Sequence, residues 1–241
     1  MTFMDDRYTG WLEWTNQGTA VFDEHLTSLA DEELDVPSLL PGWTRAHVAA
    51  HVAGNAQALV RLLSWARTGR ERRMYPDAAT RERDIEDGAR LAPAALRDLV
   101  ARTGAELADA VRALPHERWT AEVVTSGGRT VPAVEVLWMR VREVWIHAVD
   151  LDNGMSFHRF PAPLLDALLS DMVESRRRGR QEPPLLLTPT DRAATWDVPL
   201  DGRPPTRLIG STAGIVAGLS GRNLGEITFD GDSPPDLGRW L

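Results

Sequence analysis

Apolar side chains recur every three or four residues along much of the chain, which is the spacing of one face of an α-helix. This pattern predicts long helices at 6–30, 45–66, 93–113 and 132–152. Thr44 is a good N-cap for the second helix, and Pro93 and Pro132 are expected to open the third and fourth, because the first helical turn tolerates proline. Loops separate the four stretches, so they predict an antiparallel four-helix bundle.

Shorter elements are expected between and after these helices. The pattern indicates a short helix near 80–88 and a hairpin or extended loop at 122–131 around a Gly-Gly pair. After Asp152, frequent prolines divide the chain into short segments. There we expect a helix at 162–178, a helix that Ser211 caps and that ends at Gly221, and short strands at 185–188, 194–198, 206–209 and 226–229. The predicted fold class is α+β, with a bundle at 1–155 and a small α/β domain at 156–241.

Composition narrows the class of protein. The chain has 241 residues and a net charge of −8, which argues against nucleic acid or an anionic membrane as a partner. The basic runs Arg70–Arg73 and Arg176–Arg180 are expected to be solvated helix ends. No stretch is long and apolar enough to span a bilayer, and the N-terminus lacks a signal sequence, so we expect a cytoplasmic protein. The chain has no cysteine, so any thiol chemistry must use a thiol from outside.

Two of the predicted helices carry candidate metal ligands. Glu143 and His147 are four residues apart, which places them on one helical face. There they could bind one metal ion together, or form an ordinary Glu–His surface contact. His47 and His51 repeat that spacing in the second helix. Two histidines and one carboxylate would leave a fourth position open, as in catalytic zinc sites, although iron or nickel also fits these residue types. The alternative is a pair of core histidines hydrogen-bonded across helices.

Asp150 lies three residues beyond His147. Its carboxylate could orient the His147 ring from behind, as carboxylates often do for metal-bound histidines. It could equally be a helix-end residue that faces water.

Three strings of the chain carry a resemblance to a known family. They are LLPGWTRAHVAAHVAGNAQAL at 39–59, RTVPAVEVLWMRVREVWIHAVDL at 129–151 and GSTAGIVAGLSGR at 210–222. Together they resemble the mycothiol-dependent maleylpyruvate isomerases, which belong to the DinB-like group of metal-dependent, thiol-using bundle proteins. The resemblance covers essentially the whole chain. It implies a DinB-like bundle that binds a divalent metal, normally zinc, through His51, Glu143 and His147.

The resemblance also assigns roles to neighbouring residues. His47 falls on a motif histidine that is not a metal ligand in the family. Arg81 and Arg222 match the arginines that the family uses near the metal, although Arg83 lies close to the first match. For Arg222 the alternative role is a cation at a helix C-terminus.

The family reaction fits this residue set. Maleylpyruvate is a dianion with a cis double bond conjugated to carbonyl groups. Addition of a thiolate makes that bond single, so it rotates freely, and loss of the thiolate leaves trans fumarylpyruvate, a step in gentisate breakdown. Mycothiol would supply the thiol that this chain lacks, zinc would keep it ionised, and Arg81 and Arg222 would pair with the substrate carboxylates.

Two other functions stay open from the sequence. The same metal site would serve a mycothiol S-transferase that acts on other electrophiles. A metal-stabilised binding module with no catalytic activity would also have these ligands. We expect a monomer whose partners are a small dicarboxylate and a low-molecular-weight thiol.

Overall fold

The computed structural model describes residues 3–179, 183–199, 202–230 and 235–237, with side chains from Tyr8 onward. The chain divides into two compact units, Met1–Met155 and Ser156–Leu241. None of the helices in these described ranges is long and apolar enough to cross a membrane.

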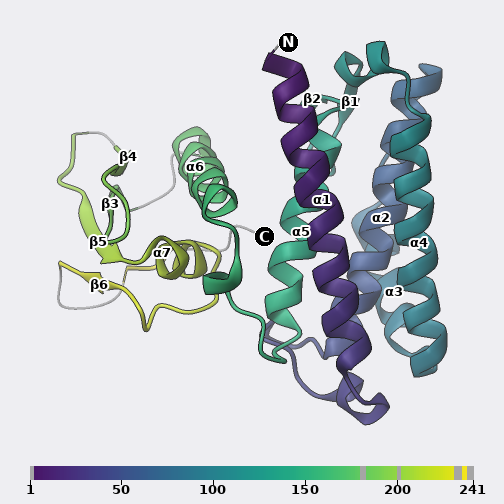
Figure 1. Cartoon of the computed structure of the whole chain (residues 1–241), viewed down its shortest axis with the longest axis horizontal. Coiled ribbons are helices and arrows are strands. Elements are labelled where there is room, and N and C mark those ends of the chain that lie inside the picture. The colour runs from purple at the N-terminus through teal and green to yellow at the C-terminus, as the bar shows by residue number, and fades with distance from the viewer. Residues whose placement is uncertain (1–2, 180–182, 200–201, 231–234, 238–241) are drawn as a thin grey trace. The chain divides into compact units, whose positions relative to one another are not determined.

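The first unit is built mainly of helices. They are α1 (Phe3–Ser28), α2 (Arg45–Thr68), α3 (Ala78–Ala89), α4 (Pro93–Ala113) and α5 (Glu135–Asp150). Helix α2 packs on α3, α4 and α5, and α1 packs mainly on α5. Figure 1 shows the four long helices side by side. Their facing stripes supply a core of fully buried side chains that includes Leu59, Leu62, Leu96, Leu137 and Ile146.

Small elements join these helices. Strands β1 (Glu122–Val124) and β2 (Thr130–Pro132) form an antiparallel hairpin with Val123 opposite Val131. Two short 3-10 helices that the sequence pattern does not predict lie at Asp31–Asp35 and His116–Thr120. They lack the length at which helical periodicity can be recognised.

The predicted start of the last bundle helix is wrong. Pro132 ends β2, paired with Glu122, and α5 begins only at Glu135. The backbone just after Pro132 bonds to residues before β1 and does not yet form a helix. Ala133 N donates to Ala121 O at 2.8 Å, and Val134 N donates to Trp119 O at 3.0 Å. A proline that cannot donate is compatible with the end of a two-stranded hairpin as well as with a first helical turn.

The second unit contains a four-stranded sheet with the order β4-β3-β5-β6. The strands are β3 (Leu185–Pro189), β4 (Trp196–Val198), β5 (Thr206–Gly210) and β6 (Thr228–Phe229). β3 and β5 are parallel, and the outer strands pair antiparallel. A short 3-10 helix at Phe157–Arg159 precedes α6 (Ala162–Gly179), which packs on α7 (Thr212–Leu219). Ser211 caps α7 as predicted, because its Oγ accepts a hydrogen bond from Gly214 N at 3.0 Å.

The interpretation of Arg176–Arg180 as a solvated helix end is wrong for its first residue. Arg176 is 3% exposed, and its guanidinium donates to Leu237 O at 2.6 Å. The long arginine side chain can reach a backbone carbonyl inside the unit, which the sequence pattern alone does not reveal. Arg180 lies outside the described residues.

Candidate metal centre

Three side chains from two helices meet inside the first unit. His51 comes from α2, and Glu143 and His147 come from α5. Glu143 Oε2 lies 2.8 Å from His51 Nε2 and 3.1 Å from His147 Nε2, and one donor atom of each residue lies within 4.8 Å of the other two. Both histidines are buried, and Glu143 is partly buried. The structure therefore brings together the three residues that the family resemblance assigns to the metal.

Helix α2 is buried on several sides, and its buried residues include five alanines, Ala46, Ala49, Ala50, Ala53 and Ala56. Small side chains let neighbouring helices pack closely on α2. The imidazole rings of His51 and His147 then meet edge to face, with centroids 4.8 Å apart.

Arg140 ties the same two helices together one turn before Glu143. Its Nη1 donates to Val52 O at 2.8 Å and to Asn55 Oδ1 at 3.1 Å, and the residue is 2% exposed. Burial lowers the pKa of Arg140 to about 10, against the opposing charges of Glu143 and Asp23. Arg140 therefore remains a cation at neutral pH and fixes the spacing between α2 and α5.

The protonation of the cluster follows from its contacts. Burial alone would raise the pKa of Glu143, but the charge of His51 and the hydrogen bonds from His147 and His51 hold it well below its usual range. For His51, burial lowers the pKa despite the attraction of Glu143. Glu143 is therefore an anion that accepts hydrogen bonds from both rings.

Asp150 holds the far side of the His147 ring. Its Oδ2 lies 2.8 Å from His147 Nδ1, and it is 0% exposed. Burial alone would lower the pKa of His147, but the hydrogen bonds with Asp150 and Glu143 raise it to about 9. Of the two roles open from the sequence, the structure places Asp150 in the orienting position.

His47, one turn earlier in α2, does not join the cluster. Thr44 N donates to its Nδ1 at 3.2 Å, and its Nε2 lies 3.4 Å from Glu86 Oε1. Its ring therefore closes the first turn of α2 together with the predicted N-cap, Thr44.

Arg81, in α3, lies next to the cluster. Its Nη2 is 3.2 Å from His51 Nδ1, and its guanidinium lies 5.8 Å from the centre of the Tyr75 ring. Because arginine can only donate, Nδ1 of His51 accepts here and its Nε2 carries the proton that faces Glu143. Arg83 instead donates to Thr80 Oγ1 at 3.0 Å and is exposed. Of these two arginines, Arg81 is the one beside the cluster.

Arg222 belongs to the second unit. Its Nη1 donates to the carbonyl of Ser220, just after the end of α7. This contact is that of a cation at a helix C-terminus. Its role toward a substrate stays a prediction.

The donor set suits a divalent metal. Two imidazole nitrogens and one carboxylate oxygen converge, and Asp150 orients one imidazole from behind. The protons now shared between Glu143 and the histidines would leave on metal binding, as they do whenever imidazole becomes a ligand. The residues present therefore fit a metal with an open coordination position.

Known proteins resemble the chain over much or all of its length. Residues 15–152 match the family model described as the mycothiol maleylpyruvate isomerase N-terminal domain. A crystal structure of the mycothiol-dependent maleylpyruvate isomerase is 37% identical, with a TM-score of 0.93 over 100% of both chains. The chain belongs to the mycothiol-dependent maleylpyruvate isomerase family. A histidine-to-alanine variant of that enzyme aligns equally well, at 36% identity and a TM-score of 0.93. No curated protein sequence matches the chain.

Two residues that lie near the cluster, Tyr75 and Arg140, were not recognised from the sequence. Tyr75 lies in the loop after α2, where no periodicity marks it, and only its contact with Arg81 reveals its position. Arg140 precedes Glu143 by three residues, a spacing that places both on one helical face. A charged residue in so apolar a stretch was the signal that could have identified it.

Proposed function

We propose that the protein is a zinc-dependent, mycothiol-dependent cis-trans isomerase that converts maleylpyruvate to fumarylpyruvate. The single observation that carries this proposal is the convergence of His51, Glu143 and His147 in a chain of this family. Zinc bound there would supply the positive charge that keeps a thiol ionised near neutral pH. In this proposal the two histidine Nε2 atoms and a Glu143 oxygen hold the metal, and Asp150 fixes the His147 ring.

The reaction needs charge stabilisation more than proton transfer. The thiolate sulfur bonds to one carbon of the cis double bond, and the π electrons move into the conjugated carbonyl. The resulting single bond rotates. The electrons then return, the C–S bond breaks, and the trans double bond forms. Arg81 would pair with a substrate carboxylate and stabilise the negative charge that develops on the carbonyl oxygen. Arg222 is proposed to pair with the second carboxylate.

We also propose a specific arrangement for each of the two units. Residues 1–155 would form a DinB-like antiparallel four-helix bundle, and residues 156–241 would form an α/β domain that contributes Arg222. The protein would act as a monomer in the cytoplasm. The packing of α1 on α5 and of α2 on both α4 and α5 supports the bundle.

The test follows the absorbance of maleylpyruvate with and without mycothiol, and then offers a generic electrophile in its place. Isomerisation that depends on the thiol supports the proposal. Loss of free thiol to the electrophile without isomerisation of maleylpyruvate would instead identify an S-transferase. A protein that loses stability when the metal is removed, yet shows no thiol-dependent turnover, would be a binding module.

A further inference from the structure

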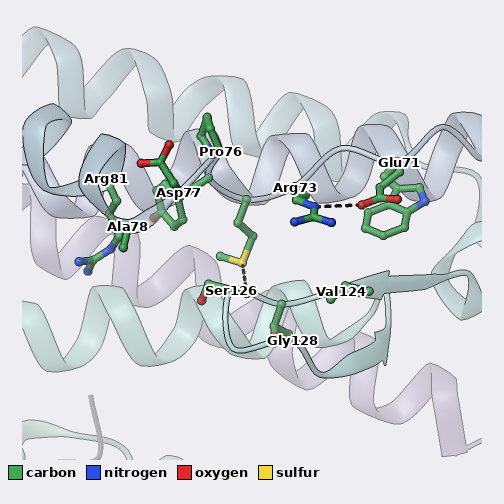
Figure 2. Close-up of a pocket in the computed structure, with 13 residues that line it drawn as sticks. Glu71, Arg73, Pro76, Asp77, Ala78, Arg81, Val124, Ser126 and Gly128 are labelled. Atoms are coloured by element: carbon green, nitrogen blue, oxygen red, sulfur yellow. Dashed lines mark hydrogen bonds and ion pairs between the residues drawn. The ribbon is translucent and has the colours of Figure 1, made fainter.

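A second feature of the first unit is a pocket of about 610 Å³. One wall is the segment from the end of α2 to the start of α3, with Met74 and Ala78, and the other is the tip of the β1–β2 hairpin. Figure 2 shows the two walls facing each other, joined where Ser126 N donates to the Met74 sulfur at 3.2 Å. A pocket of this volume is large enough for a ligand of drug size.

The lining combines aromatic rings with paired charges. Trp65 and Tyr75 offer aromatic surface, and Thr125 contributes a hydroxyl group. At the rim, Arg73 Nε donates to Glu71 Oε1 at 3.1 Å, so these two charges offset each other (Figure 2). Aromatic faces pack against the C–H surface of a sugar ring, while hydroxyl and charged groups bond its hydroxyls. Such a lining suits an uncharged or weakly charged polyol better than a dianion.

Arg81 connects the pocket with the metal cluster. Arg81 lines the pocket and also contacts His51 Nδ1 at 3.2 Å. Tyr75 lines it as well, and its pKa is raised first by burial and then by the charge of Glu143. A molecule seated in the pocket would therefore contact Arg81, which in turn contacts His51 of the metal cluster.

Size decides which reactant fits. Maleylpyruvate is a short-chain dianion and would leave most of the 610 Å³ unfilled. Mycothiol is much larger, because its acetylated cysteine is joined to glucosamine and inositol, two rings rich in hydroxyl groups. We infer that this pocket binds the glucosaminyl-inositol part of the thiol and directs the cysteine arm past Arg81 toward the metal cluster. The inference rests on the proposed function.

Two substitutions fill the pocket from opposite walls. Ser126→Trp acts from the hairpin and Ala78→Trp from the first turn of α3, and both positions are exposed, so an indole can be accommodated without disturbing the core. Arg129→Trp is the matched control, because Arg129 is exposed on the same hairpin but lies outside the lining residues. Melting curves establish whether each variant is folded. If one of the two filling variants does not fold, the other is sufficient for the test.

The binding probe is a mycothiol analogue in which alanine replaces cysteine, so that no sulfur is available to a metal. Calorimetry should show that the wild-type protein and Arg129→Trp bind it equally. Each filling variant should weaken that binding by about tenfold or more. The same variants should raise the KM for mycothiol by a similar factor while the KM for maleylpyruvate changes less than about twofold.

The results separate this inference from the proposed function. If the wild-type protein binds the analogue but shows no isomerisation, the proposed function is wrong and the pocket is still a binding site for a polyol. Wild-type protein that does not bind the analogue, or folded filling variants that bind it as the wild type does, would overturn the inference even if thiol-dependent isomerisation is intact.

Discussion

The carboxylate of Asp150 lies 2.8 Å from Nδ1 of His147 and is completely buried. With Nδ1 held in this way, the other nitrogen of the ring faces Glu143 at 3.1 Å. This hydrogen bond fixes the orientation of the His147 ring before a metal binds. Asp150, in the last turn of α5, therefore positions one of the candidate metal ligands.

Replacing Asp150 by asparagine should weaken metal binding. Asp150→Asn keeps the shape of the side chain but removes the charge that orients and polarises His147, so we expect the metal affinity to fall by about 10- to 100-fold. Competition with a chromophoric chelator measures the affinity. Asp152→Asn is the control, because Asp152 is exposed and its left-handed backbone, with φ 51°, is well tolerated by asparagine. Equal affinities in the two variants would contradict the role of Asp150.

The metal-free protein should lose stability as the pH rises toward 9. The pKa of His147 is about 9 in the folded protein, above its ordinary value of 6.5. The stabilisation is therefore complete below about pH 6.5 and is lost as the pH rises through about 9, by on the order of 3 kcal/mol. The chain has neither lysine nor cysteine, and Arg140, with a pKa lowered to about 10, titrates only at the upper end of the range.

Urea unfolding of chelator-treated protein at several pH values between 6 and 10 measures this effect. Asp150→Asn should flatten the dependence, because it weakens the hydrogen bond that contributes most to raising the pKa of His147. A free energy of unfolding that does not change over this range would show that His147 is not protonated in the folded, metal-free protein.

Arg81 and Arg83 should differ sharply in their effect on turnover. Arg81 contacts His51, whereas Arg83 bonds Thr80 on the exposed side of α3. Arg81→Gln should lower kcat/KM for maleylpyruvate by about 100-fold or more, since it removes a charged donor to the substrate. Arg83→Gln should change it less than about twofold. Metal content, measured on both variants, should stay the same, and a larger loss of turnover in Arg83→Gln would reverse the assignment.

Gly18 should be needed for the contact of α1 with α5. A Cβ placed there would lie 2.5 Å from the Trp145 ring and 2.6 Å from Val144 Cγ2. Gly18→Ala should therefore destabilise the protein by about 1–3 kcal/mol through overpacking, despite the better helix propensity of alanine. Gly10→Ala in the same helix meets no atom within 4 Å and should stabilise it slightly. Thermal unfolding compares the two, and equal effects would contradict the close packing at Gly18.

The long helices were predictable because their periodic apolar faces pack on one another. The third, predicted at 93–113, is observed as Pro93–Ala113, and the second ends within two residues of its prediction. The start of α5 was not predictable, since Pro132 suits both a hairpin and a helix. Backbone hydrogen bonds from Ala133 and Val134 to residues more than ten positions earlier decide between them.

The candidate site was predictable in its residue types but not in all its contacts. The spacing of Glu143 and His147 placed them on one face, and family resemblance selected His51 over His47. The physical reason for that selection is visible only in the fold: His47 closes the first turn of α2, whereas His51, one turn later, faces α5. Tyr75 and the pocket depend on a loop meeting a hairpin about 50 residues away, which no local pattern encodes.

The central claim is that His51, Glu143 and His147 hold a metal on which thiol-dependent isomerisation depends. The direct measurement is metal content per chain and mycothiol-dependent conversion of maleylpyruvate on the same purified samples of wild type, His51→Ala and His47→Ala. We predict that the wild type and His47→Ala contain metal and turn over, while His51→Ala remains folded, loses the metal and is inactive. A metal-free His51→Ala protein that retains full activity would contradict the claim.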